Sequence, residues 1–230
     1  MLLLTLAACP PTTPGKSSCD ELPEPPAVAG CFRGGDVEDT GGFAPIAGEW
    51  TGTVAEVGSG DFPSECTSDF GANPTASAWW ARLTTHDGDF WIGVETPGAV
   101  APTVGAELRV AATYDYGEWS ATEGSVAVYA GDTLLAWVGS SSGAESLVPP
   151  DGVTFADGTA VCDRDDDCGT VSYRDLDVTA DGAVGTVPYG DTFTLGGLTF
   201  TNGGLQQVEE DRGECLDWSP SSVLAGISRE

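Results

Sequence analysis

The chain has 230 residues, of which 40% are hydrophobic, 32 are glycine and 15 are proline. Thirty-six acidic residues face eight basic ones, which gives a formal net charge of −28. A surface of this charge repels the phosphates of nucleic acids, so nucleic acid is excluded as a partner. Salt adaptation or a GC-rich codon bias would produce the same acidity without any role in binding. The abundant Gly and Pro, together with many Thr and Val, predict short strands and turns rather than helices.

The first nine residues are an apolar segment that ends in a cysteine. Its last four residues, Leu6-Ala7-Ala8-Cys9, resemble the lipobox of bacterial lipoproteins. The resemblance implies that residues 1–8 are a signal peptide and that Cys9 is lipidated. It also implies an exported protein anchored at the bacterial cell envelope, on the outer membrane or the cell surface. The positively charged n-region is absent, so either translation begins upstream of Met1 or the match arises by chance.

Residues 9–45 are rich in Pro and Gly and show no hydrophobic periodicity. We therefore expect an extended tether between the lipidated cysteine and the folded domain. The alternative for the N-terminus is a short buried strand with a free cysteine. No later apolar run approaches the roughly 18 residues of a spanning helix, so we expect the membrane partner to be contacted through the lipid alone.

The remaining cysteines form an even set of six, namely Cys19, Cys31, Cys66, Cys162, Cys168 and Cys215. In an exported chain this number predicts three disulfides, whose connectivity the sequence alone cannot choose. Proximity along the chain favours Cys19–Cys31 and Cys162–Cys168, which leaves Cys66–Cys215. Zinc is excluded because no pair has C-x₂-C spacing and the chain has one histidine.

Residues 46–230 read as a single β domain. Turn pairs such as Asp87-Gly88 and Gly131-Asp132 lie between aromatic or β-branched runs and predict hairpins. We expect ten to twelve short strands in an all-β, antiparallel β-sandwich or jelly-roll-like fold stapled by disulfides. The runs are 49–57, 76–85, 89–95, 107–116, 125–130, 133–139, 153–156, 170–178, 183–188, 192–195, 198–201 and 205–208, with 221–228 as an optional last strand.

Alternating acids form a candidate calcium site, at Asp163, Asp165, Asp167 and Asp175. A D-x-D-x-D spacing lets carboxylates converge on one hard cation, and the run resembles the start of an EF-hand loop. Cys168 stands at the place of the usual Gly. The alternative is a solvated acidic loop closed by Cys162–Cys168.

Tryptophans form a candidate platform for a glycan or a protein ligand, at Trp79, Trp80, Trp91 and Trp119. Trp79 and Trp80 are adjacent and therefore point to opposite faces of a strand, so one belongs to the core. An exposed Trp can stack on a sugar ring or anchor a partner.

Catalysis by histidine is nearly excluded, because His86 is the only histidine and falls at a predicted hairpin tip. The acids of 209–214 form E-x-D-x-x-E, which resembles the catalytic strand of laminarinase-type jelly-roll hydrolases. In that family the intervening positions are apolar, whereas Glu210, Arg212 and Gly213 occupy them here. The leading expectation is thus a non-catalytic, surface-anchored lipoprotein that serves as a binding or envelope-structural module and takes no certain cofactor beyond the candidate calcium. The alternative is a secreted carbohydrate-active enzyme with paired carboxylates from 209–214 or 163–167.

Overall fold

The computed structural model describes residues 19–33, 46–66, 70–71, 73–115, 123–166, 169–204, 207–210 and 223–229. These ranges contain fifteen β-strands and three short 3-10 helices, at Cys19–Glu21 (η1), Ser64–Cys66 (η2) and Ala144–Ser146 (η3). The antiparallel all-β prediction is confirmed, with more strands than the ten to twelve expected. Within the described ranges, no helix is long and apolar enough to cross a membrane.

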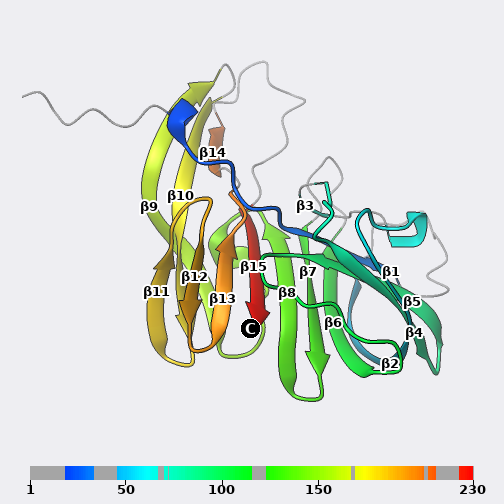
Figure 1. Ribbon diagram of the computed structural model, residues 1–230. Helices are drawn as coiled ribbons and strands as arrows, with labels where there is room; N and C mark the ends of the chain where they lie inside the picture. Colours follow the sequence, from blue (N-terminus) through cyan, green and yellow to red (C-terminus); the bar gives the residue numbers. More distant parts are fainter. Residues whose placement is uncertain are drawn as a thin grey trace, which may run out of the picture.

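The strands form two antiparallel sheets (Figure 1). The larger sheet has eleven strands, in the order β12 (Thr192–Leu195), β13 (Leu198–Asn202), β15 (Val223–Arg229), β8 (Thr133–Ser141), β7 (Glu123–Ala130), β6 (Glu107–Asp115), β2 (Ile46–Ser59), β4 (Trp79–Thr85), β5 (Gly88–Glu95), β1 (Ala29–Arg33) and β3 (Phe70–Gly71). The smaller sheet has four, with β9 (Val153–Asp166) on one side of β10 (Gly169–Ala180), and β11 (Ala183–Val187) and β14 (Gln207–Glu210) on the other.

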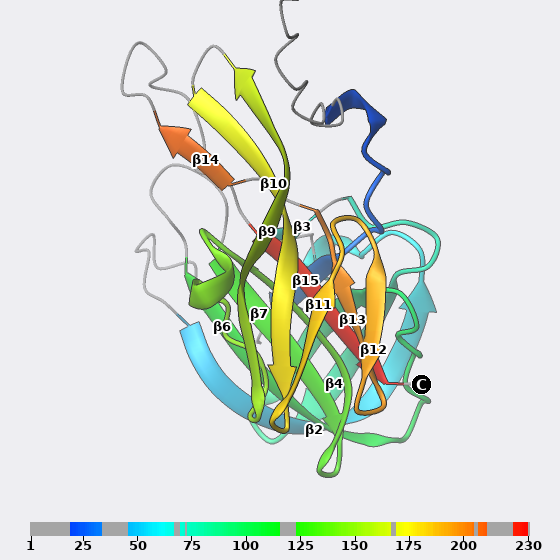
Figure 2. The same ribbon diagram turned by 90° about the vertical axis from the view of Figure 1, so that its left-hand side faces the viewer.

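The larger sheet curls over itself. Strand β2 pairs with β6 along its first half and with β4 along its second half, and it follows a long curve between them (Figure 2). The curl brings β1 against β7 and β8, which are distant in the strand order. Its concave side holds the first core, which includes Leu83, Phe90, Ile92, Val110 and Val138.

A second core lies between the larger sheet and the smaller one. The Trp137 ring stacks on Phe155 with centroids 5.5 Å apart, and Phe155 meets Phe200 edge-on. Because side chains alternate along a strand, β7 and β8 contribute to both cores: Val128 faces the first and Ala127 the second. Strands buried on both faces give the centre of the molecule a rigid frame.

The N-terminal segment differs from the expected tether. Residues 29–33 form β1 and pair with β5, and Ala29 and Cys31 are fully buried. Residues 22–28, which we call the strap, run between η1, beside the small sheet, and β1 in the large one (Figure 1). The strap packs closely, since a Cβ on Gly204 would overlap Pro25. The folded domain therefore includes residues N-terminal to 46.

The disulfide pairing differs from the one favoured by proximity. Cys19 bonds to Cys162, and Cys31 bonds to Cys66, with Cα–Cα distances of 5.7 and 5.6 Å. All three predicted pairs are therefore wrong, because each includes a cysteine that bonds elsewhere. The first bond attaches η1 to β9 of the smaller sheet, and the second attaches β1 to η2. The other members of the predicted pairs, Cys168 and Cys215, lie outside the described residues.

The predicted hairpins at Asp87-Gly88 and Gly131-Asp132 are confirmed, with Gly88 and Gly131 at positive φ. The Asp157-Gly158 pair is different. The predicted strand 153–156 stops before this pair, whereas β9 continues through it to Asp166, with irregular register opposite Arg174. The bulges bend the strand without ending it.

Candidate functional site

The predicted tryptophan platform divides between core and surface. Trp79 is buried in the first core, and Trp80 is half-buried on the opposite side of β4, as the alternation requires. Trp91 on β5 lies beside Trp80, with ring centroids 5.5 Å apart. Trp119 lies outside the described residues. The structure thus brings together two of the four predicted tryptophans.

We call the outer side of β4 and β5 the tryptophan face. A Cβ at Gly58 would overlap the Trp80 indole, so that ring lies directly on the backbone of β2. A Cβ at Gly93 would likewise meet Phe62 and the sulfur of Cys31. These glycines let large groups lie flat against the strands. The tryptophan face is therefore filled rather than hollow.

Three of the four predicted calcium ligands, Asp163, Asp165 and Asp175, lie on the β9–β10 hairpin. Asp163 and Asp165 lie in β9, where the chain is extended, and Asp167 lies outside the described residues. The Asp163 carboxylate accepts a hydrogen bond from Ser172, and the Asp175 carboxylate accepts one from the Tyr189 amide. In the described part of the chain, no group of three or more His, Cys, Asp or Glu could hold a metal ion. Asp163 and Asp165 thus lie on an extended strand, and the calcium site stays a prediction.

Two acids of the motif that resembles a hydrolase strand, Glu209 and Glu210, lie at one tip of the smaller sheet. Glu209 and Glu210 belong to β14, which pairs with the first residues of β10. Residues 211–214 lie outside the described ranges, as does the predicted lipidation site Cys9. Glu209 and Glu210 thus lie beside the beginning of β10, at the end of that strand opposite to Asp181.

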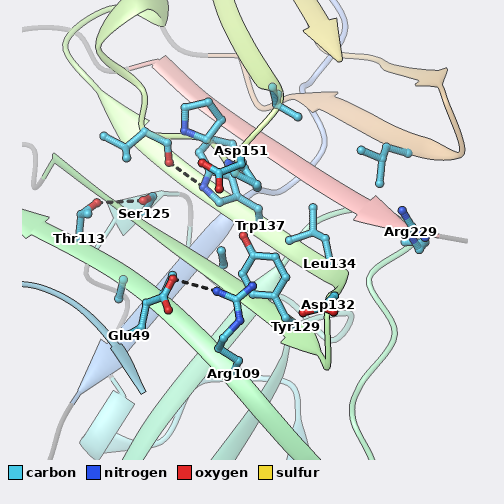
Figure 3. Close-up of a pocket in the computed structure, with 18 of the residues that line it drawn as sticks. Glu49, Arg109, Thr113, Ser125, Tyr129, Asp132, Leu134, Trp137, Asp151 and Arg229 are labelled. Carbon is cyan, nitrogen blue, oxygen red and sulfur yellow. Dashed lines mark hydrogen bonds and ion pairs between the residues drawn. The ribbon is translucent and has the colours of Figure 1, made fainter. Parts of the chain in front are cut away.

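A hollow with a volume of about 560 Å³ lies over β2, β6, β7 and β8 (Figure 3). We call it the trough. It lies on the convex side of the curled sheet, beside the second core. Residues 148–151, which we call the rim segment, border it on one side, and the β10–β11 turn at Asp181 also contributes. Its volume is within the range of small-molecule pockets, about 300–1,000 Å³.

Cross-strand pairing decides what lines the trough. The central row runs across four strands: Glu49, Ala111, Ala127 and Trp137. Neighbouring strands are about 4.8 Å apart, so the two alanines make a flat strip between a carboxylate at one end and an indole at the other. Arg109 and Tyr129 form the row on one side of this strip, and Thr113 and Ser125 form the row on the other. The trough has a small-residue floor with polar edges.

Arg109 contacts two other polar residues at one edge of the trough. Its guanidinium donates a hydrogen bond to the Glu49 carboxylate at 2.8 Å, and it lies over the Tyr129 ring, 3.9 Å from the centroid. Burial raises the pKa of the Tyr129 phenol; the carboxylates of Asp151 and Glu49 act in the same direction, while Arg109 opposes them. Tyr129 therefore holds its proton and can donate a hydrogen bond into the trough.

The other polar groups are held by the fold. The Thr113 and Ser125 hydroxyls are 2.9 Å apart and hydrogen-bonded to each other. The Trp137 indole N–H donates to the Val148 carbonyl at 3.0 Å, which fixes the rim segment to the sheet (Figure 3). Each of these groups sits on a strand or is bonded to one, so the trough is preorganised.

The trough was not predicted from the sequence. Its signal was present in the strands 107–116 and 125–130, where bulky Leu and Val alternate with small or polar residues. The bulky positions fill the first core and leave Ala111, Thr113, Ser125 and Ala127 on the other face. A strand with small residues on one face indicates either close packing or a hollow, and only the fold decides between them. No protein-family model, curated protein or solved structure matches this chain.

Proposed function

We propose that this protein is a non-catalytic binding module, exported and held at the cell envelope by a lipid on Cys9, with the trough as its ligand site. The observation that carries the proposal is the preorganised hollow itself. Its floor is made of small side chains on double-sided core strands, and its polar groups are fixed by hydrogen bonds to each other and to the rim segment. Convergent polar groups in a hollow of this size are typical of ligand sites.

The chemistry of Tyr129 supports binding over catalysis. A phenol acting as nucleophile needs a lowered pKa or an adjacent general base. Burial and the Asp151 and Glu49 carboxylates instead raise the pKa of Tyr129. The Arg109 guanidinium is held by Glu49, so this carboxylate is engaged in an ion pair. The protonated Tyr129 phenol and the Arg109–Glu49 ion pair are therefore suited to hydrogen-bonding a polar ligand in one fixed geometry.

Ligand binding is tested by NMR titration of the full chain carrying Cys9→Ala, which removes the predicted lipid. The probes are maltotetraose, cellotetraose, xylotetraose and tetralysine. We expect at least one probe to shift the amide signals of β6 and β7. Ala111→Phe should abolish these shifts by filling the trough, and Val184→Phe, which introduces the same side chain at an exposed position of β11, should retain them. Shifts from no probe, or shifts that survive Ala111→Phe, contradict the proposal.

The anchor is tested separately. In cells that process lipoproteins, the wild-type chain should sediment with membranes and carry an acyl mass on Cys9. Cys9→Ala should release the protein and lose that mass. Continued membrane retention of the variant contradicts the lipid anchor without affecting the trough.

A further inference from the structure

The shape of the trough favours a ligand with a flat face and polar edges. Ala111 and Ala127 form a strip without projecting atoms, and hydrogen-bonding side chains line both sides of it. Arg109 and Tyr129 lie on one side and the hydroxyls of Thr113 and Ser125 on the other, while Glu49 stands at one end and bonds to Arg109. A pyranose ring has this arrangement, with a flat ring face and hydroxyls around its edge.

The polar groups of the trough are richer in acceptors than in donors. Four carboxylates line it, those of Glu49, Asp132, Asp151 and Asp181, against the guanidiniums of Arg109 and Arg229. Ionised carboxylates only accept hydrogen bonds, whereas sugar hydroxyls donate them. The local excess of negative charge, and the net charge of −28 of the whole chain, repel an anionic ligand. An uncharged polyol satisfies these acceptors without that repulsion.

A cationic ligand fits less well, because the protein fills the cation position itself. The Arg109 guanidinium already lies over the Tyr129 ring, where a ligand ammonium group would make its cation–π contact. The carboxylates also do not converge, since the described residues hold no group of three or more metal-ligating side chains. Figure 3 shows three of them apart, with Glu49 at the lower left beside Arg109, Asp151 above it in the rim segment and Asp132 beyond Tyr129.

We infer that the trough binds a neutral oligosaccharide, with one sugar ring lying on the Ala111–Ala127 strip. This inference rests on the proposed function and names its ligand class. The ring hydroxyls meet the Arg109–Glu49 pair on one side and the Thr113–Ser125 pair on the other. The Tyr129 phenol donates to a further oxygen of the sugar. A volume of about 560 Å³ admits a short stretch of a chain rather than a long polymer segment.

The inference is tested on a glycan array that presents neutral, sulfated and uronic-acid-containing glycans, with the full chain carrying Cys9→Ala as the probe protein. We expect signal from neutral glycans and background from the anionic ones. The neutral glycan with the strongest signal is then titrated in solution against tetralysine. Preference for anionic glycans overturns the inference. Tetralysine binding in the trough without any neutral glycan also overturns it, but leaves the proposed binding function intact.

Two matched double variants locate the contacts. Thr113→Val with Ser125→Ala removes the paired hydroxyls of the trough at nearly constant volume, and should weaken the neutral glycan about 10- to 100-fold, as expected for the loss of two hydrogen bonds. Thr194→Val with Thr199→Ala removes a similar cross-strand pair, 3.1 Å apart, outside the trough, and should leave affinity unchanged. Thermal melts of both variants verify folding. Equal affinity of the trough variant and the wild type overturns the inference.

Discussion

The tryptophan face and the trough lie on the same convex surface of the curled sheet, and they use side-chain size in opposite ways. On the tryptophan face, glycines at 58 and 93 allow large rings to lie flat on the backbone, so the surface is filled. In the trough, the central positions are alanines, and the large rings of Tyr129 and Trp137 stand toward its edges. Surface aromatic residues can thus serve to pack against the backbone, while a hollow that could bind a ligand depends on small residues.

The largest expected effect is on the free energy of unfolding, and it distinguishes the two adjacent tryptophans. Trp79→Ala should lower the free energy of unfolding by about 3–5 kcal/mol, because it empties a buried site in the first core. Trp80→Ala should cost no more than about 2 kcal/mol, since its ring is half-buried on the tryptophan face. Chemical denaturation measures both. Equal losses of stability in the two variants would show that Trp80 contributes as much to the folded state as the buried Trp79.

The next effect concerns the disulfide beneath the tryptophan face. Replacing Cys31 and Cys66 with Ser should cost about 2–4 kcal/mol, because the unfolded chain regains the freedom of the closed loop. Peptide mapping under non-reducing conditions should recover Cys31 linked to Cys66. Neutral-glycan affinity should stay within about twofold of wild type, since no residue of this disulfide lines the trough. A large loss of affinity would mean that the two surfaces are coupled.

A smaller loss of stability is expected when Trp137, at the edge of the trough, is replaced. Trp137→Phe keeps an aromatic ring against Phe155 but removes the hydrogen bond to Val148. The lost bond is worth about 1 kcal/mol, and the smaller ring adds a packing cost of similar size. Hydrogen exchange provides the specific readout. The Val153 amide, which donates to the Pro150 carbonyl of the rim segment, should exchange faster. Unchanged exchange would show that the rim segment is held by other contacts.

The smallest effect is the alkaline dependence of stability. Because the folded pKa of Tyr129 is raised above the unfolded value of about 10, its contribution is complete below pH 10 and is lost as pH rises through the folded pKa. Tyr129→Phe should therefore flatten the fall in stability above pH 10. Tyr189, whose pKa is also raised by burial, serves as the control outside the trough: Tyr189→Phe should flatten the curve similarly and leave glycan affinity unchanged.

Local features of the fold were accessible from the sequence. Hairpins at 85–88 and 130–133 follow from turn residues, and the division of Trp79 and Trp80 follows from strand alternation. These predictions rest on interactions between residues near one another in the chain. The N-terminal strand was missed because β1 is short and follows a Pro-rich segment, and its burial depends on pairing with β5, more than fifty residues away.

Features that depend on the approach of distant segments were not accessible. Proximity along the chain chose the wrong partners for Cys19 and Cys162, which are 143 positions apart. The trough combines Glu49 with Ala111 and Trp137 through the register of four strands. The candidate sites predicted from the sequence were built on acidic residues, which are numerous, and on tryptophans, which often bind ligands. The residues that define the hollow are alanines and hydroxyl side chains, whose role appears only when the strands are paired.

The Cys19–Cys162 disulfide has a mechanical consequence. β1 lies near one edge of the large sheet, between β5 and the two-residue strand β3, so a pull on a bare N-terminus would peel it away one hydrogen bond at a time. With Cys19 bonded to β9, the same load passes through a covalent bond before it reaches the strap or β1. β9 distributes the force along its paired length with β10. A protein held at the predicted lipid on Cys9 would bear tension in the smaller sheet, leaving the strands of the trough floor unloaded.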